Sequence, residues 1–361
     1  FEIISHDNAI VNQLTLVTLM CLRKALSLLF AAVLLIVFLR RRLTAGTGPP
    51  LRRITTRDDS HTSERLLDDG AVVFRSESRE LSRGPTNGTV LVLTIVKDGQ
   101  SWGSQRSFHD YLKLISNLGV NKADLSLGLL ISDANEHRDI KQILDSSNED
   151  FRRLCIIREP ETFRKMEGER RDRHNEDIQR PRRKLLARIR NYLVTTALHD
   201  EANVLWIDAD MIKIPDNLLP TMIKSGHPIL VPSTFIGDLY YDRNTWVGPR
   251  TEPTKEQLLR LREGDSAAFI PEQAPGNMYL DQFKDREEDF VPIDAVGGTV
   301  LFVKATLHRQ GVLFPPYHVI GADWGGEGYD GVETEGLCYV AATIGAACHG
   351  MTHFDAIHSA D

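Results

Sequence analysis

Two aspartates separated by one residue form the clearest candidate for a chemical site in this sequence. Asp208 and Asp210 follow the apolar run at 204–207, whose β-branched and aromatic residues are typical of a buried strand. On an extended backbone, residues i and i+2 point to the same side, so we expect the two carboxylates to converge. Convergent carboxylates repel each other unless a cation lies between them, and such oxygen ligands suit Mg²⁺ or Mn²⁺. The carboxyl end of a strand is also where open α/β sheets bind their ligands.

Two other interpretations of this aspartate pair stay open. A D-x-D sequence is common by chance, and its aspartates can simply end a strand and cap a turn. A phosphatase of the haloacid-dehalogenase type also begins such a pair with its nucleophile, but it usually continues with a small residue and a hydroxyl residue. Met211 and Ile212 follow here. A sugar-nucleotide transferase needs only two carboxylates that bind the metal, so it fits the sequence around Asp208 and Asp210 better.

Composition indicates an ordinary globular protein. The chain has 361 residues, 42% of them hydrophobic, and a formal net charge of −7. This mild acidity argues against a nucleic-acid-binding protein, which normally carries a basic surplus. Cys338 and Cys348 are close enough in sequence to form a disulfide in an oxidising compartment, and two buried free thiols are the alternative.

The first 87 residues predict a membrane anchor and a linker. We expect a tail at 1–24, a single transmembrane anchor at 25–39, a stem at 40–87 and one folded domain at 88–361. The apolar run at 25–39 is short for a bilayer, but flanking Lys and Arg side chains can reach the interface. A cleaved signal peptide is the alternative, although three arginines directly after the run are poor flanks for a cleavage site. Asn87-Gly88-Thr89 is a glycosylation sequon if this side is lumenal.

The rest of the chain alternates between two kinds of pattern. Apolar runs at 89–96, 125–132 and 153–157 predict strands, and helix-like spacing at 108–118 separates the first two. This alternation is typical of an α/β fold with a mostly parallel central sheet. An amphipathic helix is expected at 185–198, on which Arg188 and Asn191 share a face and either hold a phosphate or face solvent. Further on, Gly297-Gly298 lets another group approach the backbone closely.

Four ordered motifs carry a resemblance to a known family. WIDADM at 206–211, VPIDAVGGTVLFVKATLHRQG at 291–311, ETEGLCYVA at 333–341 and FDAIH at 354–358 resemble the fungal mannan polymerase mannosyltransferases, glycosyltransferase family 62. The similarity covers residues 88–358. It implies a GT-A-like, Rossmann-type nucleotide-diphospho-sugar transferase that uses GDP-mannose and Mn²⁺ and retains the α configuration. It also implies a type II Golgi membrane protein with a lumenal catalytic domain.

The resemblance also assigns roles to single residues. It implies that Asp208, Asp210 and His358 hold the metal, with His349 and His353 as nearby competitors for the histidine. In the ARIRN segment, Arg188 and Asn191 are expected to hold the diphosphate. Asp133 would accept from the guanine or the ribose, with a strand-end cap as its equal rival. Arg106, in a loop with Asp98 and Trp102, would lie over the nucleotide.

On the acceptor side the expected catalytic residues are Asp294, Glu333 and Glu335. A sugar hydroxyl needs a carboxylate that orients it and removes its proton. Glu333 and Glu335 could equally be first-turn residues that complement a helix dipole.

The leading hypothesis is a metal-dependent mannosyltransferase that extends N-glycan mannan inside a hetero-complex with related subunits. The linkage, α-1,6 or α-1,2, stays open. The alternatives are a non-catalytic scaffold subunit of that complex and a metal-dependent phosphatase.

Overall fold

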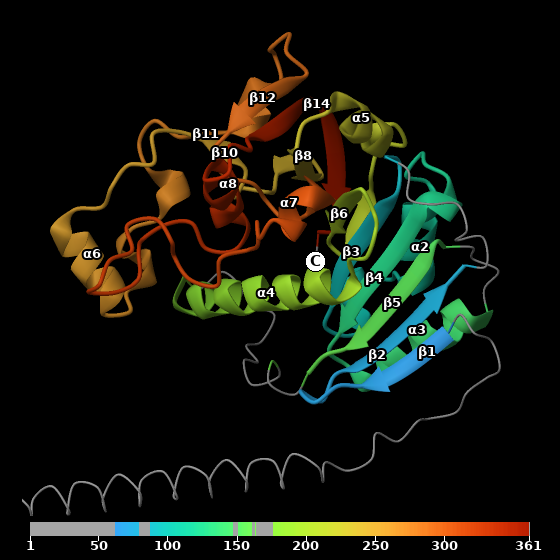
Figure 1. Ribbon diagram of the computed structural model, residues 1–361. Coiled ribbons are helices and arrows are strands. Elements are labelled where there is room, and N and C mark those ends of the chain that lie inside the picture. Colours follow the sequence, from blue (N-terminus) through green and yellow to red (C-terminus); the bar gives the residue numbers. More distant parts are fainter. Residues whose placement is uncertain (1–61, 79–86, 147–150, 161–162, 164–175, 361) are drawn as a thin grey trace, which may run out of the picture. The chain divides into compact units, whose positions relative to one another are not determined.

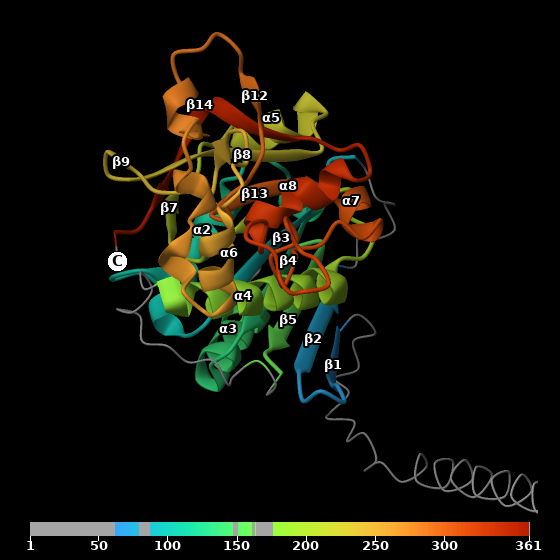
Figure 2. The same ribbon diagram turned by 90° about the vertical axis from the view of Figure 1, so that its left-hand side faces the viewer.

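The computed structural model describes residues 62–78, 87–146, 151–160, 163 and 176–360 (Figure 1, Figure 2). The expected tail at 1–24, the expected anchor at 25–39 and the first part of the expected stem lie outside these residues. Within the described ranges, no helix has both the length and the hydropathy needed to cross a bilayer.

Four parallel strands form the centre of the sheet. They are β3 (Val90–Val96), β4 (Leu125–Ile131), β5 (Arg153–Arg158) and β6 (Asn203–Ile207), in the spatial order β5-β4-β3-β6. The helices α2 (Phe108–Ser116), α3 (Ala134–Ser146) and α4 (Glu176–Ala197) connect them. The predicted α/β fold with a parallel sheet centre is therefore confirmed.

Helices cover both faces of this centre because side chains on the strands alternate between the faces. Leu91 and Leu93 of β3 belong to the same core cluster as Leu193 of α4. Val90 and Val92 pack on the opposite face, in a cluster that also holds residues of α2, α3 and α5 (Leu218–Ser225). The result is a three-layer Rossmann-type half, with α4 lying along one face (Figure 1).

The second half of the sheet is mostly antiparallel. β13 (Val300–Lys304) pairs with β6 and β8 (Ile229–Ile236), β8 runs parallel to β14 (Cys348–His358), and β12 (Phe290–Ile293) pairs with β14. The three-residue strand β7 (Met211–Lys213) pairs with the last residues of β14. The remaining elements here are β9 (Leu239–Tyr240), β10 (Trp246–Val247), β11 (Met278–Tyr279), α6 (Lys255–Arg262), α7 (Ala305–Arg309) and α8 (Thr334–Ala342).

The expected stem at 40–87 needs a correction. β1 (Thr62–Leu66) and β2 (Val72–Glu77) lie in that range and extend the sheet, since β2 pairs antiparallel with β5. Val73 and Phe74 of β2 are buried. The folded unit therefore includes strands upstream of residue 88. These two strands have no clear alternation of apolar and polar residues, and they are stabilised by pairing with the edge of the sheet.

Two other boundaries differ from the expectations. The helix expected at 185–198 begins at Glu176, because α4 continues upstream into a charged stretch that has no apolar period. The apolar residues after Gly297-Gly298 form β13, which begins at Val300, so the glycine pair lies just before the strand and not inside it.

Candidate functional site

The site lies where the order of the parallel strands reverses. β4 and β5 follow β3 on one side, while β6 lies on its other side, so the crevice between the carboxyl ends of β3 and β6 is a topological switch point. Asp208 directly follows β6 there. The backbone does not stay extended as expected, because the Met211 amide donates to the Asp208 carbonyl over 3.3 Å and closes a turn. The carboxylates of Asp208 and Asp210 therefore converge through a turn and not through strand alternation.

His358 reaches this turn through strand pairing. Its residue position lies opposite Met211 in the β14–β7 ladder, and the Ser359 amide donates to the Asp210 carbonyl over 3.0 Å. The Nε2 atom of His358 lies 3.0 Å from Oδ1 of Asp210. The ring's Nδ1–H donates to the Ser359 carbonyl over 2.7 Å, which leaves Nε2 as the nitrogen that faces the carboxylates.

Asp208, Asp210 and His358 can hold one divalent cation. One ligand atom from each residue lies within 4.8 Å of the other two. Two carboxylate oxygens and an imidazole nitrogen whose other ring nitrogen is engaged form a donor set that suits Mn²⁺. The residues present therefore fit the metal that the sequence led us to expect.

The pKa values of these groups reflect burial first and neighbouring charges second. The Asp208 side chain keeps 39% of its surface exposed, yet the protein around it raises its pKa to about 6, against the lowering effect of Arg190. Burial disfavours the charged form of His358, but the bond to Asp210 outweighs it, so the pKa of His358 is raised. Both shifts favour the protonated forms of Asp208 and His358 when no cation is bound, so protons and a cation would compete for these groups.

A buried arginine completes the positive side of the site. The Nη2 atom of Arg190 lies 3.7 Å from Oδ1 of Asp208, and its Nε donates to Oε1 of Glu333 over 2.6 Å. The guanidinium carbon lies 5.1 Å from the ring centroid of Trp206 and 5.5 Å from that of Phe314. Stacking and the ion pair together hold this guanidinium in one position beside the aspartate pair.

The Gly297-Gly298 pair has a specific role here. A Cβ added at Gly297 would lie 1.7 Å from Oδ2 of Asp242, and one added at Gly298 would lie 2.4 Å from Nη2 of Arg190. The predicted close approach is therefore made by two charged side chains. Asp242 is buried and accepts from the Thr299 hydroxyl over 2.8 Å, and burial raises its pKa. It adds a further carboxylate to the group that surrounds Asp208.

The loop after β3 lies against the aspartate turn. A Cβ added at Gly103 would lie 3.0 Å from Oγ of Ser359 and 3.6 Å from Cβ of Asp210. Trp102 is buried and donates from Nε1 to Glu136 over 2.6 Å, and Arg106 donates to the Trp102 carbonyl over 3.1 Å. The loop that was expected over a nucleotide thus borders the site, with Arg106 fixing its backbone.

Three expected nucleotide-binding residues are engaged elsewhere. Arg188 is exposed and its guanidinium lies 5.2 Å from the Phe163 ring centroid, on a different side of α4 from Arg190. The Asn191 amide donates to and accepts from the Phe314 backbone over 2.7 and 2.9 Å. Asp133 caps α3, accepting from the Asn135 and Glu136 amides. The structure does not bring Arg188 and Asn191 together on one binding face.

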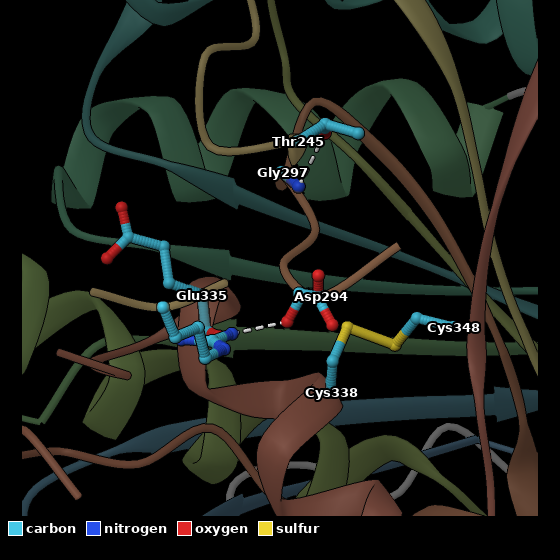
Figure 3. Close-up of a disulfide and its surroundings, with 7 residues drawn as sticks. Thr245, Asp294, Gly297, Glu335, Cys338 and Cys348 are labelled. Carbon is cyan, nitrogen blue, oxygen red and sulfur yellow. Dashed lines mark hydrogen bonds between the residues drawn. A yellow bond between two sulfur atoms is a disulfide. The ribbon is translucent and has the colours of Figure 1, made fainter. Parts of the chain in front are cut away.

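The three expected acceptor-side carboxylates lie in different surroundings. Glu333 is buried against Arg190, and its φ of 55° is unusual for a residue other than glycine. Glu335 is buried against Arg183 over 2.7 Å; burial raises its pKa although Arg183 lowers it. Asp294 accepts from the Gly248 amide over 2.8 Å. Figure 3 shows the Glu335 side chain directed away from the Cys338–Cys348 disulfide, near which Asp294 is drawn.

Sequence reasoning missed Arg190 and Asp242. Arg190 had a usable signal, because it falls on the buried stripe of α4 together with Ala187 and Val194, at spacings of three and four residues. A charged residue on such a stripe needs a buried partner. Asp242 lies in an irregular segment and had no comparable signal.

Comparisons with known proteins agree with these motifs. A family model described as Anp1 matches residues 75–318. The chain is 25% identical over 272 residues to the mannan polymerase complex subunit mnn9 of Schizosaccharomyces pombe, covering 70% of this chain and 77% of that protein. It is 26% identical over 281 residues to the mannan polymerase complex subunit MNN9 of Candida albicans, covering 69% and 71%.

Among solved structures, the chain resembles a mannosyltransferase from Pyrobaculum calidifontis in complex with GDP-Man and Mn²⁺. The TM-score is 0.43 at 12% identity, and the match covers 77% of this chain and 59% of that one.

Proposed function

The chain belongs to the Anp1 family, and from this membership we propose that it transfers mannosyl groups from GDP-mannose to N-glycan mannan as a subunit of a mannan polymerase complex. Relatives of this chain are subunits of such complexes. The proposal includes dependence on Mn²⁺ and retention of the α configuration at the transferred sugar.

One observation carries the catalytic part of the proposal. Asp208, Asp210 and His358 come from two distant parts of the chain and present three ligand atoms within 4.8 Å, at the switch point of the sheet. A subunit that only scaffolded the complex would have no need to keep this costly group of charges together. A phosphatase would need a free nucleophile at Asp208, whereas here Arg190 and the neighbouring acids surround that carboxylate.

The chemistry would be divided among the residues at the site. Asp208, Asp210 and Nε2 of His358 would hold the cation, which when bound neutralises charge on the leaving diphosphate. Glu333, Trp206 and Phe314 hold Arg190 in place, and its Nη2 faces Asp208, so this edge of the guanidinium would donate to the diphosphate without reorganisation. The loop around Gly103 would limit the access of water from the β3 side.

We also propose that the folded unit works in the Golgi lumen behind an N-terminal anchor. Two observations support an oxidising, glycosylating compartment. Cys338 and Cys348 form a disulfide, a bond that persists in secretory compartments, and the Asn87 side chain of the sequon is exposed. Microscopy of the tagged full chain, with glycosidase treatment to detect a glycan at Asn87, tests this location.

The decisive experiment is calorimetric titration of the protein with GDP-mannose, with and without Mn²⁺. We expect binding that requires Mn²⁺ and is lost in Asp210→Ala but kept in Asp216→Ala, a matched change at an exposed aspartate nine residues after the end of the apolar run of β6. Transfer from GDP-mannose to an α-mannoside should show the same pattern. Metal-independent binding would contradict the proposed site, and complex activity that survives Asp210→Ala would favour the scaffold alternative.

A further inference from the structure

Two ion pairs of the same kind line one side of α4. Arg190 pairs with Glu333 beside Asp208, and Arg183 pairs with Glu335 over 2.7 Å. Arg183 and Arg190 are seven residues apart and therefore lie on one face of the helix, two turns or ~10.5 Å from each other. The Arg183–Glu335 pair lies farther from the metal ligands, nearer the N-terminal end of α4.

A groove begins at this second pair. Glu335 and Arg183 line a pocket together with Phe269 and Tyr329, and a second pocket shares Arg180, Leu261 and Ser266 with the first. The first pocket has a volume of about 30 Å³, enough for little more than a water molecule, whereas the second, at about 400 Å³, is large enough for a sugar ring. We call the two together the α4–α6 groove. Its lining comes from α4, the end of α6, the segment 266–272 and the glycine-rich segment 318–329, which includes Gly325 and Gly326. Figure 1 and Figure 2 both place α6 beside the N-terminal part of α4.

The charges in the groove are matched. Arg183 pairs with Glu335, Lys184 pairs with Glu327 over 2.6 Å, and Arg262 pairs with Asp323 over 2.9 Å. Arg180 donates to the backbone carbonyls of Leu261 and Gly328, and Glu272 adds a fourth carboxylate to the four basic side chains around the groove. A groove without surplus positive charge does not suit a phosphate or a nucleotide. It offers instead a mixture of hydrogen-bond donors and acceptors, which suits a neutral ligand rich in hydroxyl groups.

Aromatic side chains add apolar surface in the groove and next to it. Phe269 and Tyr329 form an edge-on pair with ring centroids 5.8 Å apart. Trp324 directly precedes Gly325, which lines the second pocket, and its exposure is 107%. The other three tryptophans, Trp102, Trp206 and Trp246, are at most 1% exposed. A fully exposed indole beside a polar groove provides a flat face on which the apolar side of a sugar ring can stack.

We propose that the α4–α6 groove binds the oligosaccharide acceptor, with Trp324 stacking on a sugar remote from the reacting end. The groove ends at the Arg183–Glu335 pair, two helical turns along α4 from the Arg190–Glu333 pair, so the sugars that it binds would be those remote from the reacting end. The inference rests on the proposed mannosyltransferase function and names how its acceptor is recognised.

The exposure of a single tryptophan allows a direct test. Iodide quenches only indole rings that solvent reaches, so the quenchable fluorescence of the protein belongs to Trp324. We expect linear α-mannohexaose to protect this fluorescence in a saturable way, and inorganic phosphate to leave it unchanged. Absence of protection by mannohexaose at any concentration overturns the proposal, and so does equal protection by phosphate.

A variant separates acceptor binding from donor binding. Trp324→Ala should raise the KM for mannohexaose about fivefold, the loss of one aromatic contact, while the Kd for GDP-mannose stays the same. Leu66→Ala, which removes an exposed apolar side chain on β1, is the matched control and should change neither value. An unchanged KM for mannohexaose in Trp324→Ala contradicts the proposal.

The outcomes distinguish this inference from the proposed function. If the wild-type protein binds no GDP-mannose but mannohexaose still protects Trp324, the mannosyltransferase proposal fails while the glycan groove stands. If GDP-mannose binds and mannose is transferred while Trp324 stays quenchable, the transferase stands and the groove proposal fails.

Discussion

The Nε atom of Arg190 donates to Oε1 of Glu333 over 2.6 Å, which joins α4 to the start of α8 across 143 residues of sequence. Both side chains are buried, and the backbone of Glu333 has a φ of 55°. Such a backbone conformation costs on the order of 1–3 kcal/mol, so the surrounding contacts must compensate for it. The pair therefore serves to fix the guanidinium next to Asp208 and not merely to join two helices.

The first prediction concerns this guanidinium. Arg190→Ala should lower the free energy of unfolding by about 3–5 kcal/mol, because Glu333 would remain buried without its partner. The variant should also lose affinity for GDP-mannose. Chemical denaturation and calorimetry measure the two effects.

Arg188→Ala provides the control on the same helix. Its exposed side chain should change stability by no more than ~0.5 kcal/mol and leave GDP-mannose binding intact. If Arg188→Ala abolished donor binding while Arg190→Ala did not, the original expectation for Arg188 would be restored and our assignment of Arg190 would be wrong.

The second prediction separates the histidines near the C-terminal end of the described chain. His358→Ala should weaken Mn²⁺ binding by more than roughly 100-fold. Removing a residue that only hydrogen-bonds to a metal ligand typically weakens binding roughly 10–100-fold, and loss of the ligand itself should cost more. His353→Ala should not, since His353 is exposed and lies 3.9 Å from Asp289. Mn²⁺ titration followed by electron paramagnetic resonance distinguishes them. Equal affinities in the two variants would exclude His358 as a ligand.

The third prediction concerns pH. Without a cation, the pKa of Asp208 is about 6 in the folded protein, above its ordinary 3.8. The folded state therefore binds this proton more tightly than the unfolded state, and the resulting stabilisation is lost as pH rises through about 6. The raised pKa of His358 acts in the same direction.

Mn²⁺ should reverse this trend because it competes with the same protons. We expect the increase in Tm caused by Mn²⁺ to grow between about pH 5 and pH 7. Thermal unfolding across this range, with and without Mn²⁺, measures it. A metal effect that is constant with pH would show that Asp208 and His358 do not exchange protons for the cation.

The fourth prediction concerns the disulfide between Cys338 of α8 and Cys348 of β14. It closes a loop with a sequence separation of 10, so reduction should lower the free energy of unfolding by about 2–3 kcal/mol. Urea unfolding with and without a reductant measures the loss. A Cys338→Ser variant should be insensitive to the reductant, whereas a reductant effect that persisted there would point to another cause.

The sequence alone determined the local features of this protein. Apolar runs that alternate with helical periods specify the parallel centre, because buried strands and amphipathic helices have periods that can be read along the chain. The aspartate pair at the end of the Val204–Ile207 run and the close approach at Gly297-Gly298 were likewise visible in neighbouring residues.

Only the tertiary structure decided which distant groups meet at the site. The pairing of β14 with β7 brings His358 to Asp210, and the rotation of α4 turns Arg190 inward and Arg188 outward. The edge strands β1 and β2 likewise depend on β5 as a pairing partner. Each of these contacts depends on the packing of segments far apart in the chain, and a helix phase or a strand partner is fixed by that packing and not by local composition.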